Sequence, residues 1–258
     1  MKVANAVSPA EWLKARRALL KKEKELTRLR EETAAARRAL PWVEVEKEYY
    51  FEGPQGPQKL ADLFAGRDQL IIYHFMFGPG WVEGCPSCSY LMDHVDGALP
   101  HLNARGVTFA AVSRAPWAEL APFKKRMGWK FPWVSSFGGD FNNDFHVSST
   151  AAEREAGKFT YNFAESPAPP VEELPGASVF IKDEEGTVFH TYSTYARGLD
   201  PVVGTYQWLD LTPKGRDEES LAFPMAWVRH HDKYGTGYSI DPLANYEPPK
   251  GSVCRAGA

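Results

Sequence analysis

Two cysteines separated by two residues, Cys85 and Cys88, are the side chains of this sequence best suited to chemistry. They follow a loop of glycine and proline, and before that loop an apolar and aromatic run extends from Leu70 to Phe77. Such a run is typical of a strand buried on both faces. Two thiols one helical turn apart can close a small disulfide and reopen it by thiolate exchange. The pattern therefore predicts a dithiol redox site.

The residues after Cys85 place this pair at the start of a helix. Apolar side chains recur at helical spacing as far as Asn103, so the predicted helix begins at Cys85. Unpaired backbone N–H groups and the helix dipole stabilise a thiolate at such a position. Pro86 suits the first turn, where no N–H is needed. We expect Cys85 to be the accessible attacking thiolate and Cys88, which faces the sheet, to be less accessible.

Other interpretations of the cysteines and histidines are less favoured. A structural zinc site needs four ligands, and the third cysteine, Cys254, has no partner near it in sequence. Two inert buried cysteines are the other alternative. His230, His231 and Asp232 suggest a metal site, but adjacent side chains do not readily face one ion. We therefore expect no metal and no cofactor, and we expect Cys254 to be dispensable.

Composition excludes several classes of protein. The 258 residues are 43% hydrophobic and 24% charged with a formal net charge of −3, so no strong field favours nucleic acid or an anionic membrane as the main partner. No apolar run approaches the roughly 18 residues of a membrane span, and the N-terminus lacks the apolar segment of a signal peptide. We expect a cytoplasmic protein, in which a Cys-x-x-Cys pair is more often catalytic than structural.

A long amphipathic helix is predicted over Glu11–Leu40. Ser8 and Pro9 provide its cap and first residue, and Glu11 completes a capping box. Apolar residues recur at seven-residue steps, while ten Lys and Arg residues stand against five Glu. An RNA- or membrane-binding arm is one interpretation. We favour a helix with a solvated face that packs on the domain or on a second subunit, and we expect a homo-oligomer.

The rest of the chain alternates strands and helices. Strands are expected at 43–51, 107–113 and from 131. A short helix or turn is expected at 59–65, a helix at 117–127 that Gly128 ends, and a helical closing element at 195–211. Residues 177–181 and 187–192 are expected to form a hairpin that turns at Gly186. Residues 165–175 are proline-rich and resemble an insertion or linker. Strand–helix–strand order predicts a parallel crossover. We divide the chain into an N-terminal amphipathic helix (1–40), a domain (41–211) and a C-terminal extension docked on it (212–258).

This order of elements resembles the thioredoxin fold, an α/β fold with a mixed sheet flanked by helices. Within that superfamily the sequence is similar to a bacterial group of thioredoxin-like proteins catalogued as a domain of unknown function. The resemblance extends over most of the chain and is carried by Tyr73-His-Phe-Met-Phe-Gly-Pro, Gly84-Cys-Pro-Ser-Cys-Ser, Asn103-Ala-Arg-Gly-Val-Thr-Phe-Ala-Ala-Val-Ser-Arg-Ala-Pro, Phe131-Pro-Trp-Val-Ser-Ser-Phe, Asp144-Phe-His-Val-Ser and His190-Thr-Tyr-Ser-Thr-Tyr-Ala-Arg-Gly.

The resemblance implies that Cys85 is the nucleophilic thiol and Cys88 the resolving thiol. Pro79 stands where thioredoxins place a buried Asp, and Gly176 stands where they place a cis-proline, with Pro175 one residue earlier. These departures favour a narrower partner than that of a general reductase. The candidate substrate-binding residues are Trp81, Pro86, Trp133, Gly176 and Ala177. The aromatic candidates Trp81 and Trp133, with Phe131, can equally be core residues, because aromatic side chains are usually buried.

The sequence thus predicts a cytoplasmic dithiol-disulfide oxidoreductase. Its partners would be a disulfide-containing protein or small molecule and a thiol electron donor, without nucleic acid or membrane. A thiol-dependent peroxide reductase is the first alternative, in which Cys85 attacks an O–O bond and Cys88 resolves the sulfenic acid. A non-catalytic binding module on a thioredoxin scaffold is the second, because a fold does not fix a function.

Overall fold

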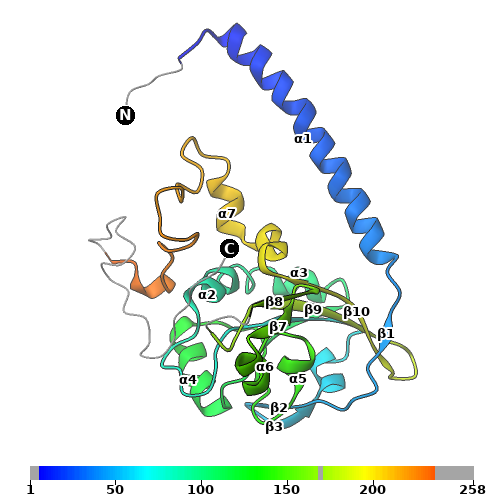
Figure 1. The fold of residues 1–258 in the computed structure, drawn as a ribbon. Coiled ribbons are helices and arrows are strands. Elements are labelled where there is room, and N and C mark those ends of the chain that lie inside the picture. Colours follow the sequence, from blue (N-terminus) through cyan, green and yellow to red (C-terminus); the bar gives the residue numbers. More distant parts are fainter. Residues whose placement is uncertain (1–5, 168–170, 236–258) are drawn as a thin grey trace. The chain divides into compact units, whose positions relative to one another are not determined.

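The computed structural model describes residues 6–167 and 171–235 (Figure 1). The chain forms two units, residues 1–42 and residues 43–258, and each is described by itself. Cys254, which we expect to be dispensable, lies outside the described residues.

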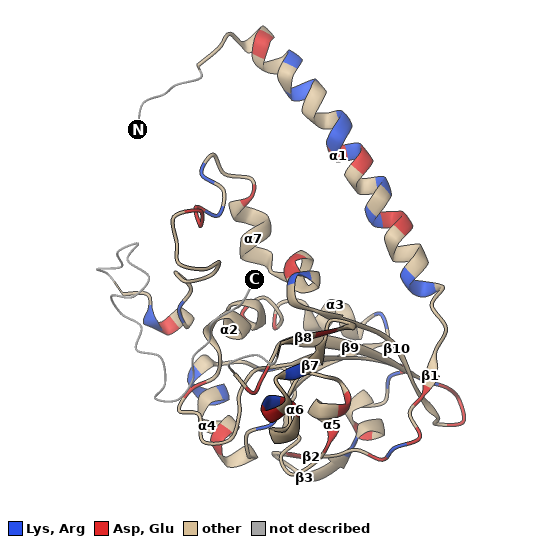
Figure 2. Cartoon of the chain, viewed as in Figure 1, with Lys and Arg blue, Asp and Glu red and all other residues tan. Residues whose placement is uncertain are grey.

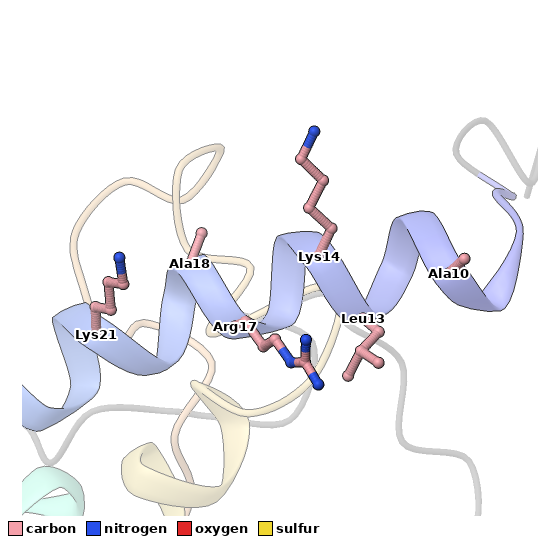
Figure 3. Close-up of a pocket in the computed structure, with 6 residues that line it drawn as sticks. All are labelled: Ala10, Leu13, Lys14, Arg17, Ala18 and Lys21. Atoms are coloured by element: carbon pink, nitrogen blue, oxygen red, sulfur yellow. The ribbon is translucent and has the colours of Figure 1, made fainter.

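In its described part, residues 6–42, the first unit contains one helix, α1 (Pro9–Arg38), as the sequence predicts. The Ser8 hydroxyl accepts from the Glu11 N–H, and the Glu11 carboxylate accepts from the Ser8 N–H, so the predicted capping box is present. Both signs of charge are distributed along the helix (Figure 2). Figure 3 shows a hollow on α1 whose lining residues all come from this one helix: Ala10, Leu13, Lys14, Arg17, Ala18 and Lys21.

The second unit is built on a mixed eight-stranded sheet in the order β1-β10-β9-β4-β5-β6-β2-β3. The strands of this sheet are β1 (Val43–Glu44), β2 (Tyr50–Gly53), β3 (Gly56–Lys59), β4 (Gln69–His74), β5 (Val107–Ser113), β6 (Trp133–Ser135), β9 (Gly176–Lys182) and β10 (Val188–Tyr195). Strands β4, β5 and β6 are parallel, whereas β9 is antiparallel to β4 and to β10. A separate hairpin joins β7 (Lys158–Tyr161) to β8 (Ala164–Pro167).

Helices make the crossovers between the parallel strands. The α-helices of this unit are α2 (Pro86–Met92), α3 (Leu99–Asn103), α4 (Trp117–Met127), α5 (Phe141–Asp144), α6 (Ala151–Ala156) and α7 (Gly204–Leu209), and the 3-10 helices are η1 (Leu60–Phe64), η2 (Ala196–Val202) and η3 (His231–Lys233). The chain runs from β4 through α2 and α3 to β5, and from β5 through α4 to β6. The β9–β10 hairpin then follows, and η2 and α7 come after it. This is a thioredoxin-like α/β fold, as the sequence predicts.

Two predicted elements differ in the structure. The predicted strand 43–51 is two strands, because Val43 and Glu44 pair with β10 at one edge of the sheet while Tyr50–Gly53 pairs with β3 and β6 at the other. The predicted helix from Cys85 to Asn103 is divided into α2 and α3. Two carboxylates between α2 and α3 form hydrogen bonds with residues that follow α4. Asp93 accepts from the Trp129 indole N–H at 2.8 Å, and Asp96 accepts from the Phe131 N–H at 3.0 Å.

Apolar side chains pack on both faces of the sheet. Because successive residues of a strand point to opposite faces, Leu70 and Ile72 of β4 belong to one cluster, whereas Tyr73 and Phe75 belong to a second cluster that includes Cys85 and Cys88. The predicted linker 165–175 is not a simple connection, because β8 pairs within it and the Glu173 side chain is buried. The dithiol thus lies in the apolar layer between α2 and the sheet.

Candidate active site around Cys85 and Cys88

The candidate site lies at the carboxyl edge of the parallel strands. Because β4, β5 and β6 run in the same direction, their last residues meet at one edge. Beyond β4 the chain keeps contact with β5, since the Phe75 N–H donates to the Val112 carbonyl and Phe77 accepts from the Ala115 N–H, each at 2.8 Å. The loop from Gly78 to Gly84 then leads into α2 (Figure 1).

Cys85 is the N-cap residue of α2, and Pro86 is its first helical residue, as the sequence predicts. The Cys85 N–H donates to the Met76 carbonyl at 3.1 Å, and the Cys85 carbonyl accepts from the backbone N–H and the hydroxyl of Ser89, each at 2.9 Å. These bonds fix the backbone of Cys85 between the end of β4 and the first turn of the helix.

The loop approaches the core closely at Gly84. A Cβ on residue 84 would lie 2.6 Å from Phe75 Cε1 and 2.9 Å from Phe123 Cε1, so only glycine fits. This approach helps to bury the residue that follows, and the Cys85 side chain is only 4% exposed. We expected solvent to reach Cys85. The structure instead buries it, because the loop and the apolar cluster both close around it.

Cys88 lies deeper than Cys85, with a side chain that is only 1% exposed. The two cysteines are free, with no disulfide between them. Burial, followed by the neighbouring Cys85 thiol, raises the pKa of the Cys88 thiol well above its ordinary value, although Tyr73 and Met76 act in the opposite direction. Cys88 is therefore a protonated thiol at neutral pH.

The C-terminal segment 223–234, which we call the strap, contacts the loop just before Cys85. His230 is 1% exposed, and its Nε2 lies 2.9 Å from the Gly84 carbonyl oxygen. Arg126 Nη2 lies 2.8 Å from His230 Nδ1, so Nδ1 must accept and the Nε2 proton is donated to Gly84. Burial lowers the pKa of His230, which is neutral in this arrangement.

Charged residues continue this contact between the strap and the loop. Glu83 accepts from Arg126 and from Lys233, the latter at 2.7 Å, and Arg126 also pairs with Asp232 at 2.8 Å. Burial tends to raise the pKa of Glu83, but these hydrogen bonds outweigh it and the pKa is lowered. The strap is thus held to the Cys85 loop by a network of partly buried ion pairs.

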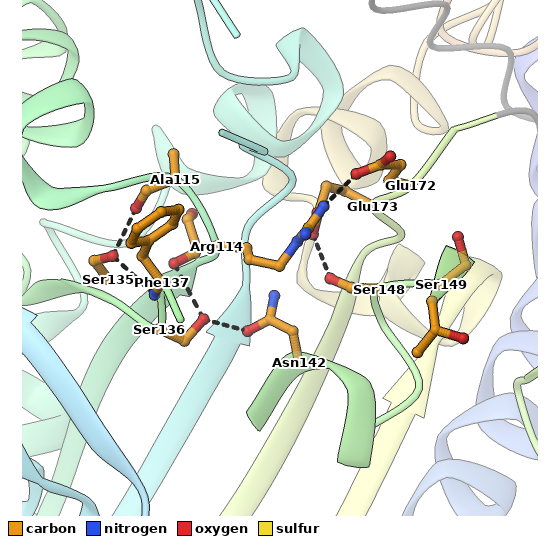
Figure 4. A network of polar contacts seen from close by, with 12 residues as sticks. Arg114, Ala115, Ser135, Ser136, Phe137, Asn142, Ser148, Ser149, Glu172 and Glu173 are labelled. Carbon is orange, nitrogen blue, oxygen red and sulfur yellow. Dashed lines mark hydrogen bonds and ion pairs between the residues drawn. The ribbon is translucent and has the colours of Figure 1, made fainter. Parts of the chain in front are cut away.

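A second polar cluster lies at the same edge of the sheet (Figure 4). The Glu173 carboxylate is 1% exposed, accepts from Arg114 Nε at 2.6 Å and accepts from the Ser148 hydroxyl at 2.5 Å. Burial raises the pKa of Glu173 in spite of Arg114. A Cβ on Gly78 would lie 3.4 Å from Glu173 Cγ and 2.9 Å from Trp81 Nε1. This cluster therefore supports the start of the loop that carries the dithiol.

The predicted substrate-binding residues lie in different surroundings. Trp81 and Ala177 are half-buried against the apolar cluster that contains both cysteines, and Pro86 is buried in the first turn of α2. Gly176 pairs with His74 and is packed so closely that a Cβ would lie 2.7 Å from Tyr195 Cδ1. Trp133 is in the core: it is 1% exposed, and its ring centroid is 4.5 Å from that of Phe75.

Several residues of this site were not singled out from the sequence. Tyr73 could have been found, because alternation along β4 puts it on the same face as Phe75. No sequence feature close to Glu173 or Arg114 indicates that these two residues belong to the site. The histidine pair considered as a metal site has other partners: His230 bonds the Cys85 loop, and His231 bonds Asp93 at 2.7 Å. Among the described residues, no group of three or more His, Cys, Asp or Glu side chains could hold a metal ion.

The fold and the paired thiols define a thioredoxin-like α/β protein with a Cys-x-x-Cys pair at the start of a helix. The chain belongs to the family described as "Bacterial protein of unknown function (DUF899)", which matches residues 1–234. The predicted resemblance to a bacterial domain of unknown function is thereby confirmed. No curated protein sequence matches the chain. Within the described residues, none of the helices combines the length and apolar character needed to cross a membrane.

Three solved structures illustrate the similarities to known folds. Peroxidoxin BcpB from Mycobacterium tuberculosis is 14% identical, with 67% of this chain and 97% of that chain covered and a TM-score of 0.38. Peroxiredoxin Q from Xanthomonas campestris is 17% identical, with 66% and 96% covered and a TM-score of 0.39. A putative protein disulfide isomerase from Bacteroides thetaiotaomicron is 15% identical, with 65% and 91% covered and a TM-score of 0.36.

Proposed function

We propose that this protein is a thiol redox enzyme in which Cys85 attacks the substrate and Cys88 resolves the product. The observation that carries the proposal is the placement of two free cysteines at the start of α2, with Cys85 as the N-cap residue and Cys88 in the first turn. Two thiols one helical turn apart can form a disulfide without a large movement of the chain. Cys85 is at the helix N-terminus, where N–H groups and the dipole favour a thiolate, whereas the buried Cys88 is held as a thiol.

The reaction we propose for a disulfide substrate has two exchanges. The Cys85 thiolate forms a bond to one substrate sulfur, and the substrate disulfide breaks with its electron pair on the other sulfur. Cys88 then forms a bond to Cys85, the bond from Cys85 to the first substrate sulfur breaks, and that sulfur leaves with the electron pair and the Cys88 proton. The substrate is reduced by two electrons and the dithiol is oxidised to a disulfide. A thiol electron donor would reduce the enzyme again.

A peroxide is the second candidate substrate, and the burial of Cys85 favours it. A side chain that is 4% exposed is more easily reached by a small oxidant than by a disulfide on a folded protein. Cys85 would attack the O–O bond and become a sulfenic acid, and Cys88 would displace its oxygen as water to form the same intramolecular disulfide. Both candidates use the same two thiols, so the substrate distinguishes them.

The test compares four variants in the full-length protein. Cys254→Ser serves as the background, so that every measured thiol belongs to the pair, and Cys85→Ser, Cys88→Ser and the double variant are added to it. We expect the background protein to lose both thiols together across a series of redox buffers, with an intramolecular disulfide found by peptide mapping. Consumption of peroxide, compared with reduction of a small aromatic disulfide, then identifies the substrate class.

The same variants show how the proposal could fail. Cys88→Ser should accumulate a mixed disulfide or a sulfenic acid on Cys85, whereas Cys85→Ser should form neither. If the two thiols stay reduced in every buffer and the background protein consumes neither substrate, a non-catalytic binding module is the better interpretation. The Cys88→Ser protein would also retain a protein substrate as a covalent complex that a thiol reductant releases.

A further inference from the structure

Helix α1 carries a row of large apolar side chains that stay exposed. Trp12, Leu19 and Leu26 recur at seven-residue steps along its 30 residues, and Leu29 lies one helical turn after Leu26. The exposed fractions of these four residues are 59%, 50%, 47% and 59%. None of the described residues of α1 is buried. An apolar row that remains in water along a whole helix is typical of an interaction surface.

The seven-residue repeat assigns each side chain of α1 to one of the positions a to g of a coiled coil. Positions a and d form the seam between two such helices. The a positions are Trp12, Leu19, Leu26 and Thr33, and the d positions are Ala15, Lys22, Leu29 and Ala36. A helix of 30 residues is about 45 Å long, so this seam is long enough to pack against an identical helix over four heptads.

The positions that flank the seam carry opposite charges. Position g is occupied by Glu11, Ala18, Glu25 and Glu32, and position e by Arg16, Glu23, Arg30 and Arg37. When two parallel helices pack in register, each g residue faces the e residue five positions further along the partner. The facing pairs are then Glu11 with Arg16, Ala18 with Glu23, Glu25 with Arg30 and Glu32 with Arg37. Three of these four pairs join opposite charges, and none joins like charges.

Other arrangements of the same two helices bring like charges together. In an antiparallel pair, g faces g and e faces e, so the row of three Glu would meet its own copy and so would the row of three Arg. A parallel pair shifted by one heptad would place Glu11 or Glu25 opposite Glu23. The charges therefore favour the parallel arrangement in register over both alternatives.

We propose that α1 pairs with the α1 of a second copy of this chain as a parallel, two-stranded coiled coil in register. The inference does not depend on the proposed redox function. Lys22 is the weakest point of the seam, but it is exposed, and its long stem lets the ammonium reach water from between two helices. A charged residue on the seam lowers stability while it helps to fix register and the number of strands. The dimer is therefore reversible.

The test measures the mass of the full-length reduced protein by sedimentation equilibrium over a range of concentrations. We expect a reversible change from one chain of 28.9 kDa to two chains. Glu25→Arg and Arg30→Glu each change two equivalent pairs of the dimer from attraction to repulsion, so each should raise the dimer Kd about 4- to 30-fold. The double variant exchanges the two charges and should return the Kd to within about threefold of the natural value.

Two further variants separate the seam and its flanks from general effects of charge. Glu31→Arg makes the same charge reversal at the outward position f, and it should leave the Kd within about twofold. Lys22→Leu puts an apolar side chain into the seam and should lower the Kd by about tenfold or more. All of these side chains are exposed in the chain, so the substitutions do not disturb a core.

The outcomes that would overturn the coiled coil are specific. A natural protein that stays monomeric at every concentration, or whose mass exceeds two chains, would rule out the two-stranded pair. If Glu25→Arg and Arg30→Glu leave the Kd unchanged or lower it, the parallel arrangement is wrong, because these changes relieve like charges in an antiparallel pair. A double variant no tighter than the single variants, an equal loss in Glu31→Arg, or no gain in Lys22→Leu would also overturn it. None of these results bears on the dithiol, so the proposed function stands or falls separately.

Discussion

Replacing His230 by alanine should open the strap and expose Cys85. The side chain is 1% exposed, donates to the Gly84 carbonyl at 2.9 Å and accepts from Arg126 at 2.8 Å. Its ring centroid also lies 5.3 Å from that of Phe123. Arg126 keeps Asp232 and Glu83 as partners, but the buried Gly84 carbonyl loses its donor from the strap. An unsatisfied buried group costs about 1–3 kcal/mol, and the lost ring adds to this.

The expected effect on reactivity follows from this free energy. If the substitution destabilises the closed strap by about 3 kcal/mol relative to the open strap, the equilibrium constant for local opening rises roughly 100-fold, since 1.4 kcal/mol corresponds to a factor of ten. The assay is alkylation of Cys85 by iodoacetamide in the Cys254→Ser background, followed by peptide mapping. His231→Ala is the control, because that side chain is 43% exposed and bonds Asp93 away from the loop. Its labelling rate should stay within about twofold of the background.

The pH dependence gives an independent check on His230. Burial makes its pKa lower in the closed strap than in the open chain, where about 6.5 is the ordinary value. The closed strap is therefore fully stabilised above that pH, and stability is lost as the pH falls from about 6.5 toward the lower pKa of the closed state. Glu83 favours the charged form of His230, whereas Arg126 and Lys233 disfavour it. The labelling ratio of His230→Ala to background should fall toward one as the pH falls.

One result would refute this reasoning about the strap. If His230→Ala lowers the thermal unfolding midpoint but leaves the labelling rate of Cys85 unchanged, the strap stabilises the fold without limiting access. A ratio that does not change with pH would show that His230 does not titrate in the expected direction.

Three further predictions concern other parts of the molecule. Because burial raises the pKa of Cys88, iodoacetamide should label Cys85 first below about pH 8.5, and preferential labelling of Cys88 on peptide mapping would contradict the assigned order. Gly176→Ala should cost about 1–3 kcal/mol in urea unfolding, since its Cβ would lie 2.7 Å from Tyr195, whereas Gly97→Ala, with open space around it, should not. Deleting α1, whose apolar residues include several exposed leucines, should lower the oligomer mass in light scattering, and a monomeric full-length protein would rule this out.

Local signals explain the parts of the fold that the sequence predicts. The start of α1 follows from the capping box of Ser8 and Glu11, and the end of α4 follows from Gly128, which has a φ of 69°. The β9–β10 hairpin turns at Gly186, with a φ of 92°. The conformation at each of these positions is decided by residues within a few positions along the chain. Such features can be predicted from one sequence.

The parts that could not be predicted depend on partners far apart in sequence. The bond from His230 to Gly84 spans 146 residues, and that from Arg114 to Glu173 spans 59. Nothing near Cys85 indicates that a distant strap contacts its loop, so we expected an exposed thiol. The division between α2 and α3 likewise depends on Asp96, whose carboxylate bonds the backbone ahead of β6. These contacts form only when the whole chain has folded.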